Sequence, residues 1–81
     1  MVTKKIDVTA TAGIYSRQTP WVFMLVKNTG STDCSIDFDR EISADSYLLE
    51  VGEVITVEDR PFKRLFYKTA SSTTTLYTVA G

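Results

Sequence analysis

The chain has 81 residues, with nine basic and ten acidic side chains, one cysteine and no histidine. We expect a single domain over residues 1–81, because chains divide into domains only beyond roughly 250 residues. One cysteine excludes an intrachain disulfide, and the lack of histidine removes the commonest general base and a principal zinc ligand. The net charge of −1, with basic residues dispersed along the chain, disfavours nucleic acid as a partner.

The N-terminal segment has no targeting pattern. The lysines that follow Met1 precede no apolar stretch, so we expect no secretory signal, no membrane partner and synthesis in the cytoplasm. Lys4–Ala10 alternates apolar and polar residues, which is typical of a half-buried strand. Ile14–Thr19 fits either a short edge strand or a loop, and residues 1–20 are expected as an arm or an edge strand.

Pro20–Asn28 is the most apolar segment. Trp21, Phe23 and Leu25 share one face of the predicted strand, and the residues between them are apolar as well. A strand that is apolar on both faces is covered on both faces. In a chain this short, that cover comes from loops or from a second subunit.

A turn and a second alternating segment follow. Residues 28–31, Asn-Thr-Gly-Ser, have the composition of a turn, and Thr32–Asp39 alternates with Cys34 on its inward side. We therefore predict a hairpin between Pro20–Asn28 and Thr32–Asp39. The stretch 40–46 is ambiguous, with a single helical turn as one alternative.

The C-terminal half consists of short apolar strands between turns. Strands are expected at Tyr47–Val51, Val54–Glu58, Phe62–Thr69 and Thr74–Ala80, with breaks at Gly52-Glu53, Asp59-Arg60-Pro61 and Ser71-Ser72. Valine, isoleucine and threonine make up 25 of the 81 residues, which favours strands over helices. About seven strands with short connections predict an all-β fold, an antiparallel β-sandwich or jelly-roll-like flattened barrel.

No set of side chains predicts chemistry. Cys34 has no histidine to act as its base and lies in an inward row, so we interpret it as a core residue. The carboxylates between Asp33 and Asp45 lack the glycine and the spacing of a calcium loop, and strand alternation explains them as a solvated face. We predict that the chain is not an enzyme and has no catalytic residue, no metal and no cofactor.

Large apolar side chains are in surplus on strands that the pattern already covers. Large aromatic residues commonly anchor interfaces between proteins. We therefore expect a contact between subunits of a homo-oligomer, with a trimer preferred over a dimer. The residues predicted to form it are Trp21, Phe23, Leu25, Phe62 and Phe66.

Two other functions remain open on the sequence. The first is a carbohydrate- or ligand-binding module, which would use exposed aromatic residues around Tyr15, Trp21 or Tyr47. The second is a single-strand nucleic-acid binder, in which basic residues alternate with an aromatic stacking platform. Its residues would be Lys63, Arg64, Phe66 and Lys68.

The order of motifs also carries a family resemblance. Val22–Asn28 leads into Gly30-Ser31, then Leu48–Val57 forms a strand, a Gly-Glu turn and a strand, and two further strands end the chain at Ala80. This order resembles small β-sandwich virion proteins of tailed bacteriophages, of the head-decoration and tail-accessory type, although Val51 stands where such motifs often have proline. The resemblance implies a virion structural protein that decorates or reinforces a capsid or tail surface. Its implied partners are further copies of itself and a larger viral protein, such as a capsid or tail protein.

Overall fold

Eight β-strands form two antiparallel sheets in the computed structural model, which describes residues 1–58 and 60–81. Sheet A has the strand order β1-β8-β3-β6 and sheet B the order β2-β7-β4-β5. The strands are β1 (Val2–Val8), β2 (Gly13–Trp21), β3 (Met24–Asn28), β4 (Cys34–Phe38), β5 (Tyr47–Leu49), β6 (Val54–Val57), β7 (Phe62–Lys68) and β8 (Thr74–Ala80). The predicted all-β sandwich is confirmed, with eight strands instead of about seven. Within the described ranges, no helix is long and apolar enough to cross a membrane.

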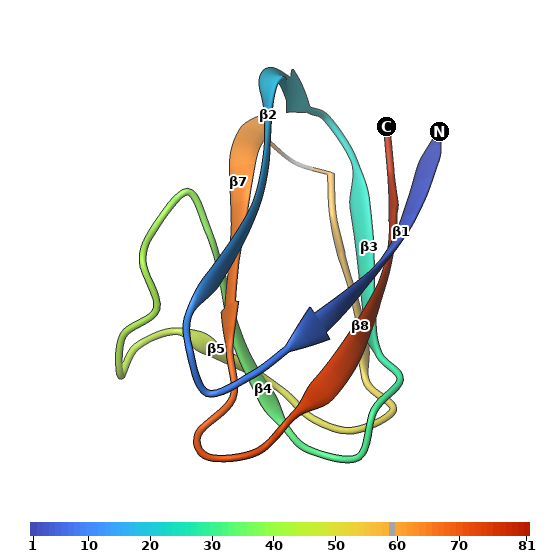
Figure 1. Ribbon diagram of the computed structural model, residues 1–81. Coiled ribbons are helices and arrows are strands. Elements are labelled where there is room, and N and C mark those ends of the chain that lie inside the picture. Colours follow the sequence, from blue (N-terminus) through green and yellow to red (C-terminus); the bar gives the residue numbers. More distant parts are fainter. Residues whose placement is uncertain (59) are drawn as a thin grey trace.

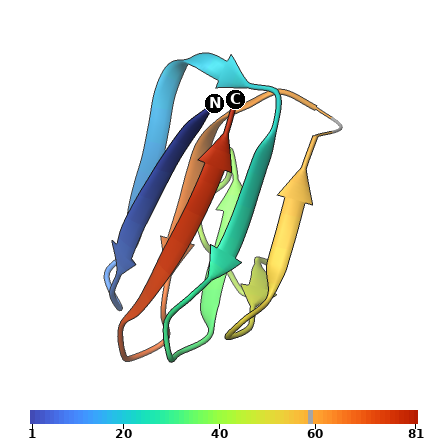
Figure 2. The ribbon, with the colours of Figure 1, turned by 90° about the vertical axis from the view of Figure 1, so that its right-hand side faces the viewer.

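The chain follows the path of a jelly roll. The first four strands pair with the last four in reverse order, β1 with β8, β2 with β7, β3 with β6 and β4 with β5. Two more pairings, β3 with β8 and β4 with β7, join these ribbons into sheets. Every connection except that between β4 and β5 links strands of different sheets, which is the jelly-roll arrangement. Figure 1 shows the two layers, and Figure 2 shows sheet A toward the viewer, with β1 and β6 at its opposite edges.

The core lies between the sheets and is built by strand alternation. Sheet A contributes mainly Ile6, Val8, Met24, Val26, Leu76 and Ala80, and sheet B contributes Trp21, Cys34, Ile36, Leu49, Phe62 and Leu65. Cys34 is fully buried, so its interpretation as a core residue is confirmed. Burial raises the pKa of its thiol above the ordinary value, although a hydrogen bond with the backbone of Lys68 acts in the opposite direction.

The segment predicted as one strand at Pro20–Asn28 is two strands in different sheets. β2 ends at Trp21 in sheet B, and β3 begins at Met24 in sheet A. The corner is tied to the C-terminus, because the backbone N–H groups of Val22 and Phe23 donate to the carbonyl of Gly81 at 2.9 and 3.3 Å. This crossing explains the apolar run, since Trp21 points into the core from one sheet and Met24 from the other.

The predicted hairpin between Pro20–Asn28 and Thr32–Asp39 is wrong. β3 belongs to sheet A and β4 to sheet B, so the turn between them is an arch across the sandwich. The buried Asn28 side chain holds this arch by accepting a hydrogen bond from Gly30 N–H at 3.1 Å and donating one to the Thr32 carbonyl at 2.8 Å. An arch and a hairpin need the same turn composition, so the local sequence does not distinguish them.

Two ambiguous segments are now defined. Residues 1–20 form β1 and most of β2, which are edge strands of the two sheets, and not a free arm. Residues 40–46 contain no helical turn; they form a loop that ends in a turn closed by a 3.1 Å hydrogen bond from Ser46 N–H to the Ser43 carbonyl. Of the break predicted at residues 59–61, Asp59 lies outside the described residues.

Candidate protein-binding surface

Half of the exposed large apolar side chains lie in one short segment. The eight such residues among those described are Met1, Val2, Ile14, Val22, Tyr47, Leu48, Val51 and Val54. Four of them fall within residues 47–54, which cover β5, the turn after it and the start of β6. We call residues 47–54 the apolar segment.

Strand pairing explains why the apolar segment is exposed. β5 pairs with β4 through Leu49 opposite Cys34, which directs the Leu49 side chain into the core. The neighbouring Leu48 therefore points to the outer face of sheet B, where it is 53% exposed. Val54 likewise faces outward, because Ile55 beside it packs against the core.

The turn that presents Val51 is held from several sides. Gly52 has a φ of 82°, as the third residue of a type II turn requires, and Glu53 N–H donates to the Glu50 carbonyl at 2.9 Å. Val51 N–H donates to Asp33 Oδ1 at 3.0 Å, a hydrogen bond that proline at this position would lose. The turn is therefore preorganised, which lowers the entropic cost of binding through it.

A hydrogen bond between Tyr47 and Glu53 closes the same turn. The Tyr47 hydroxyl donates to Glu53 Oε2, and Glu50 N–H donates to Glu53 Oε1 at 2.9 Å. The contact with Glu53 raises the pKa of Tyr47 above its ordinary value, and the contact with Tyr47 lowers the pKa of Glu53. The phenol thus stays protonated and the carboxylate charged at neutral pH.

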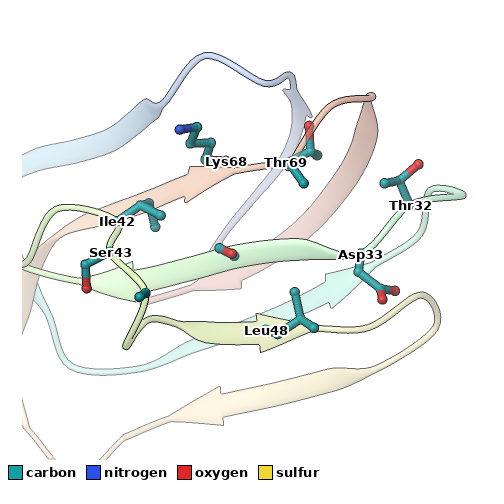
Figure 3. Close-up of a pocket in the computed structure, with 10 residues that line it drawn as sticks. Thr32, Asp33, Ile42, Ser43, Leu48, Lys68 and Thr69 are labelled. Atoms are coloured by element: carbon teal, nitrogen blue, oxygen red, sulfur yellow. The ribbon is translucent and has the colours of Figure 1, made fainter.

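A groove on the outer face of sheet B lies beside the apolar segment. Its volume is about 660 Å³, and Leu48 forms part of its wall (Figure 3). The other lining residues are Thr32, Asp33, Ser35, Ile42, Ser43, Ala44, Lys68, Thr69 and Ala70. The lining combines hydroxyl and methyl groups with one carboxylate and one ammonium group. Such a lining suits contact with a peptide surface better than binding of a single charged ligand.

The loop after β4 forms one side of this groove and is anchored by two aspartates. Asp37 Oδ2 accepts hydrogen bonds from Arg40 Nε and Ser46 Oγ, both at 3.0 Å. Asp39, with a φ of 58°, accepts from the backbone N–H groups of Lys63 and Arg64 through Oδ1. Partial desolvation alone would raise the pKa of Asp37, but its hydrogen bonds outweigh that effect and lower it.

These contacts give the acidic residues structural roles. Asp33, Asp37 and Asp39 each accept backbone or side-chain hydrogen bonds that hold loops in place. In the part of the chain that the structure describes, no group of three or more Asp, Glu, Cys or His side chains is placed to hold a metal ion.

The predicted interface residues separate into three groups. Trp21 and Phe62 are 1% and 2% exposed and stack in the core, with ring centroids 5.5 Å apart. Phe66 lies on the outer face of sheet B but is 6% exposed, since it shares a small cavity wall with Ile14 and Ile42 and Arg64 lies 5.9 Å from its ring. For these three residues the predicted role between subunits is wrong, because a single copy already buries them.

Phe23 and Leu25 stay candidates for contact. Both are half-buried: Phe23 lies in the corner between β2 and β3, and Leu25 lies on the outward side of sheet A, opposite Val79 and Thr56. Of the apolar segment, only Tyr47 was predicted as part of a site, in the carbohydrate- or ligand-binding alternative. The signal for this segment was the pair Leu48-Leu49, since two adjacent leucines in a strand cannot both face one core.

Comparison with known proteins adds a fold relationship only. No protein-family model matches the chain, and no curated protein matches it. Among solved structures, the chain is similar to PirA, with a TM-score of 0.67 over 98% of this chain and 93% of that one. The sequence identity is 14%, so the likeness shows a shared sandwich fold and carries no function across.

Proposed function

We propose that the chain is a non-enzymatic virion structural protein that decorates or reinforces a capsid or tail surface. It acts through protein–protein contacts, with copies of itself and with a larger viral protein. The observation that carries the proposal is the exposed apolar segment at residues 47–54, on a turn that hydrogen bonds hold rigid. Its exposed side chains lie on the edge strands β5 and β6 and the turn between them, with Leu48 outward on sheet B and Val54 outward on sheet A. A concentration of exposed apolar side chains in one region is typical of surfaces that bind other proteins.

The chemistry of the molecule supports binding over catalysis. The sequence has no histidine, and the only thiol is buried with a raised pKa. The jelly-roll arrangement occurs in viral capsid domains and also in lectins and cupins, so the fold alone supports this proposal by analogy.

Each alternative loses one aromatic residue on which it depended, although Tyr47 of the carbohydrate alternative is 48% exposed. A carbohydrate module built on Trp21 lacks an exposed ring there, since that ring is packed against Tyr15 and Phe62. A nucleic-acid platform built on Phe66 lacks an exposed stacking surface for the same reason. The virion proposal uses neither ring.

The test is attachment to particles assembled by the virus that encodes the chain. We expect the parent protein to co-sediment with heads or tails at a fixed ratio. The variant Leu48→Lys should bind these particles more weakly and remain in the supernatant. Adding one charge to an interface centre costs roughly 1–2 kcal/mol or more, so binding should weaken about tenfold or more. Val22→Lys is the matched control, because Val22 is 64% exposed and lies in the corner between β2 and β3, outside the apolar segment.

Two results contradict the proposal. Absence of the chain from purified particles would remove the virion role. Equal binding by Leu48→Lys and the parent, with both folded by circular dichroism, would remove the apolar segment as the contact.

A further inference from the structure

The two sheets have four edge strands, and three of them carry features that restrict pairing to an edge that complements them. β1 contains Lys4 and Lys5, β2 contains Pro20 and a register irregularity, and β5 is three residues long. Charges, proline, irregular register and short length all protect sheet edges. β6, with the sequence Val-Ile-Thr-Val, has no charge, no proline and a regular register with β3.

The free side of β6 is prepared to accept a strand. Every second residue of an antiparallel strand directs its N–H and C=O away from its partner. Among the described residues, β6 pairs only with β3, so these groups face outward. Val54 and Thr56 are exposed on the same strand.

We propose that β6 of one copy pairs with β1 of a second copy and so extends sheet A from molecule to molecule. Strand directions alternate along the order β1-β8-β3-β6, so β6 and β1 run in opposite directions (Figure 2). A second copy placed beside β6 in the same orientation therefore continues the antiparallel pattern. The same placement brings β2 of the second copy to the side of β5, which is its antiparallel counterpart in sheet B.

Charge favours β1 as the occupant. β6 is flanked by Glu53 and Glu58, and β1 carries Lys4 and Lys5. Lys5 lies on the outward side of β1, and Glu58 continues the outward row of β6. A register with Lys5 opposite Glu58 places opposite charges side by side on the same face.

That register also joins the apolar rows of the two copies. With Lys5 opposite Glu58, Ile6 is opposite Val57 and Val8 is opposite Ile55. Ile6 and Val8 are buried against the core, and Ile55 and Val57 are half-buried beside it. The junction thus covers the inner side chains that the edge of sheet A leaves partly open.

A twofold contact between two β6 strands is disfavoured. Directly opposite residues of an antiparallel pair share a face, so a twofold pairing would be centred on Ile55 or on Thr56. These registers set Glu58 opposite Gly52 or Val54 of the second copy. Neither register gives Glu58 a partner of opposite charge, whereas the β6–β1 register does. The β6–β1 contact is head-to-tail, so it builds a closed ring or an open filament, and not an isolated twofold dimer.

The inference rests on the proposal that this is a self-associating structural protein, and it is tested on the purified chain without particles. Lys5→Glu alone and Glu58→Lys alone should each weaken self-association about tenfold, measured by sedimentation over a concentration series. An equimolar mixture of the two variants should restore it, because each copy then meets an edge of opposite charge. Lys63→Glu and Glu41→Lys change the charge equally at exposed positions away from both edges and should behave like the parent.

Hydrogen exchange of the parent chain provides a second measurement that needs no variant. Amides of residues 54–57 and 2–8 should exchange more slowly as protein concentration rises. A parent that stays monomeric at about 1 mM, with no concentration dependence of exchange, overturns the proposal. Unchanged association of Lys5→Glu alone also overturns it and indicates a contact that does not involve β1, such as the twofold β6 contact. Neither result bears on particle binding through Leu48.

Discussion

Replacement of Asn28 by leucine should remove a large part of the stability of the fold. The Asn28 side chain is fully buried and makes four hydrogen bonds. It donates to the carbonyls of Thr32 and Leu49 at 2.8 and 3.0 Å, and accepts from Gly30 N–H at 3.1 Å and Thr74 Oγ1 at 2.7 Å. One side chain thus ties together the arch after β3, the strand β5 and the strand β8.

The expected loss of folding stability follows from the number of hydrogen bonds that Asn28 makes. Leucine keeps the volume, but each hydrogen bond contributes about 1 kcal/mol and the partner groups become buried without a partner. A loss of roughly 3–5 kcal/mol results, compared with a total free energy of unfolding of about 4–12 kcal/mol for a chain of 81 residues. The urea midpoint should fall by about 2 M or more, since small domains have slopes near 1–2 kcal/mol per M.

The fluorescence of Trp21 provides the assay, because it is the only tryptophan and is 1% exposed in the folded chain. Thr74→Val removes one of the four hydrogen bonds and should cost about 1–2 kcal/mol, which keeps the test informative if Asn28→Leu does not fold. The reasoning is refuted if Asn28→Leu unfolds within about 1 kcal/mol of the parent.

Two further predictions concern turns and acid stability. Gly30→Ala should destabilise by about 2 kcal/mol or more, because its Cβ would lie 2.0 Å from Thr74 Oγ1 and 2.5 Å from Thr75 N; a midpoint equal to that of the parent contradicts this. The lowered pKa of Asp37 contributes stability that is complete above its ordinary pKa of 3.8 and is lost as pH falls through the lowered value. Asp37→Asn should therefore be less stable than the parent near pH 6, with the difference shrinking below about pH 4; a difference independent of pH excludes this linkage.

Local pattern determined most of the strands. Thr74–Ala80 was predicted with the bounds that the structure has, and the other strand positions agree within a few residues except at Pro20–Asn28, which is divided between β2 and β3. Alternation also placed Cys34 in the core, and Asp37 of β4 with the flanking Asp33 and Asp39 outside it. These properties depend on which face of a strand a side chain occupies, and the two-residue period of the sequence records that directly.

Only the tertiary structure decided which sheet each strand joins. Trp21 and Met24 look like neighbours on one strand, yet the chain crosses between sheets at the two residues between them. Trp21, Phe62 and Phe66, three of the five residues that predicted a subunit contact, are buried by that crossing and by the loop over Phe66 within a single copy. Strand pairing here joins residues up to 78 positions apart, such as Val2 with Ala80. Periodicity describes the faces of one strand and carries no information about its distant partner. The pair Leu48-Leu49 shows that one of these leucines faces away from the core, but only the pairing of β5 with β4 decides that it is Leu48.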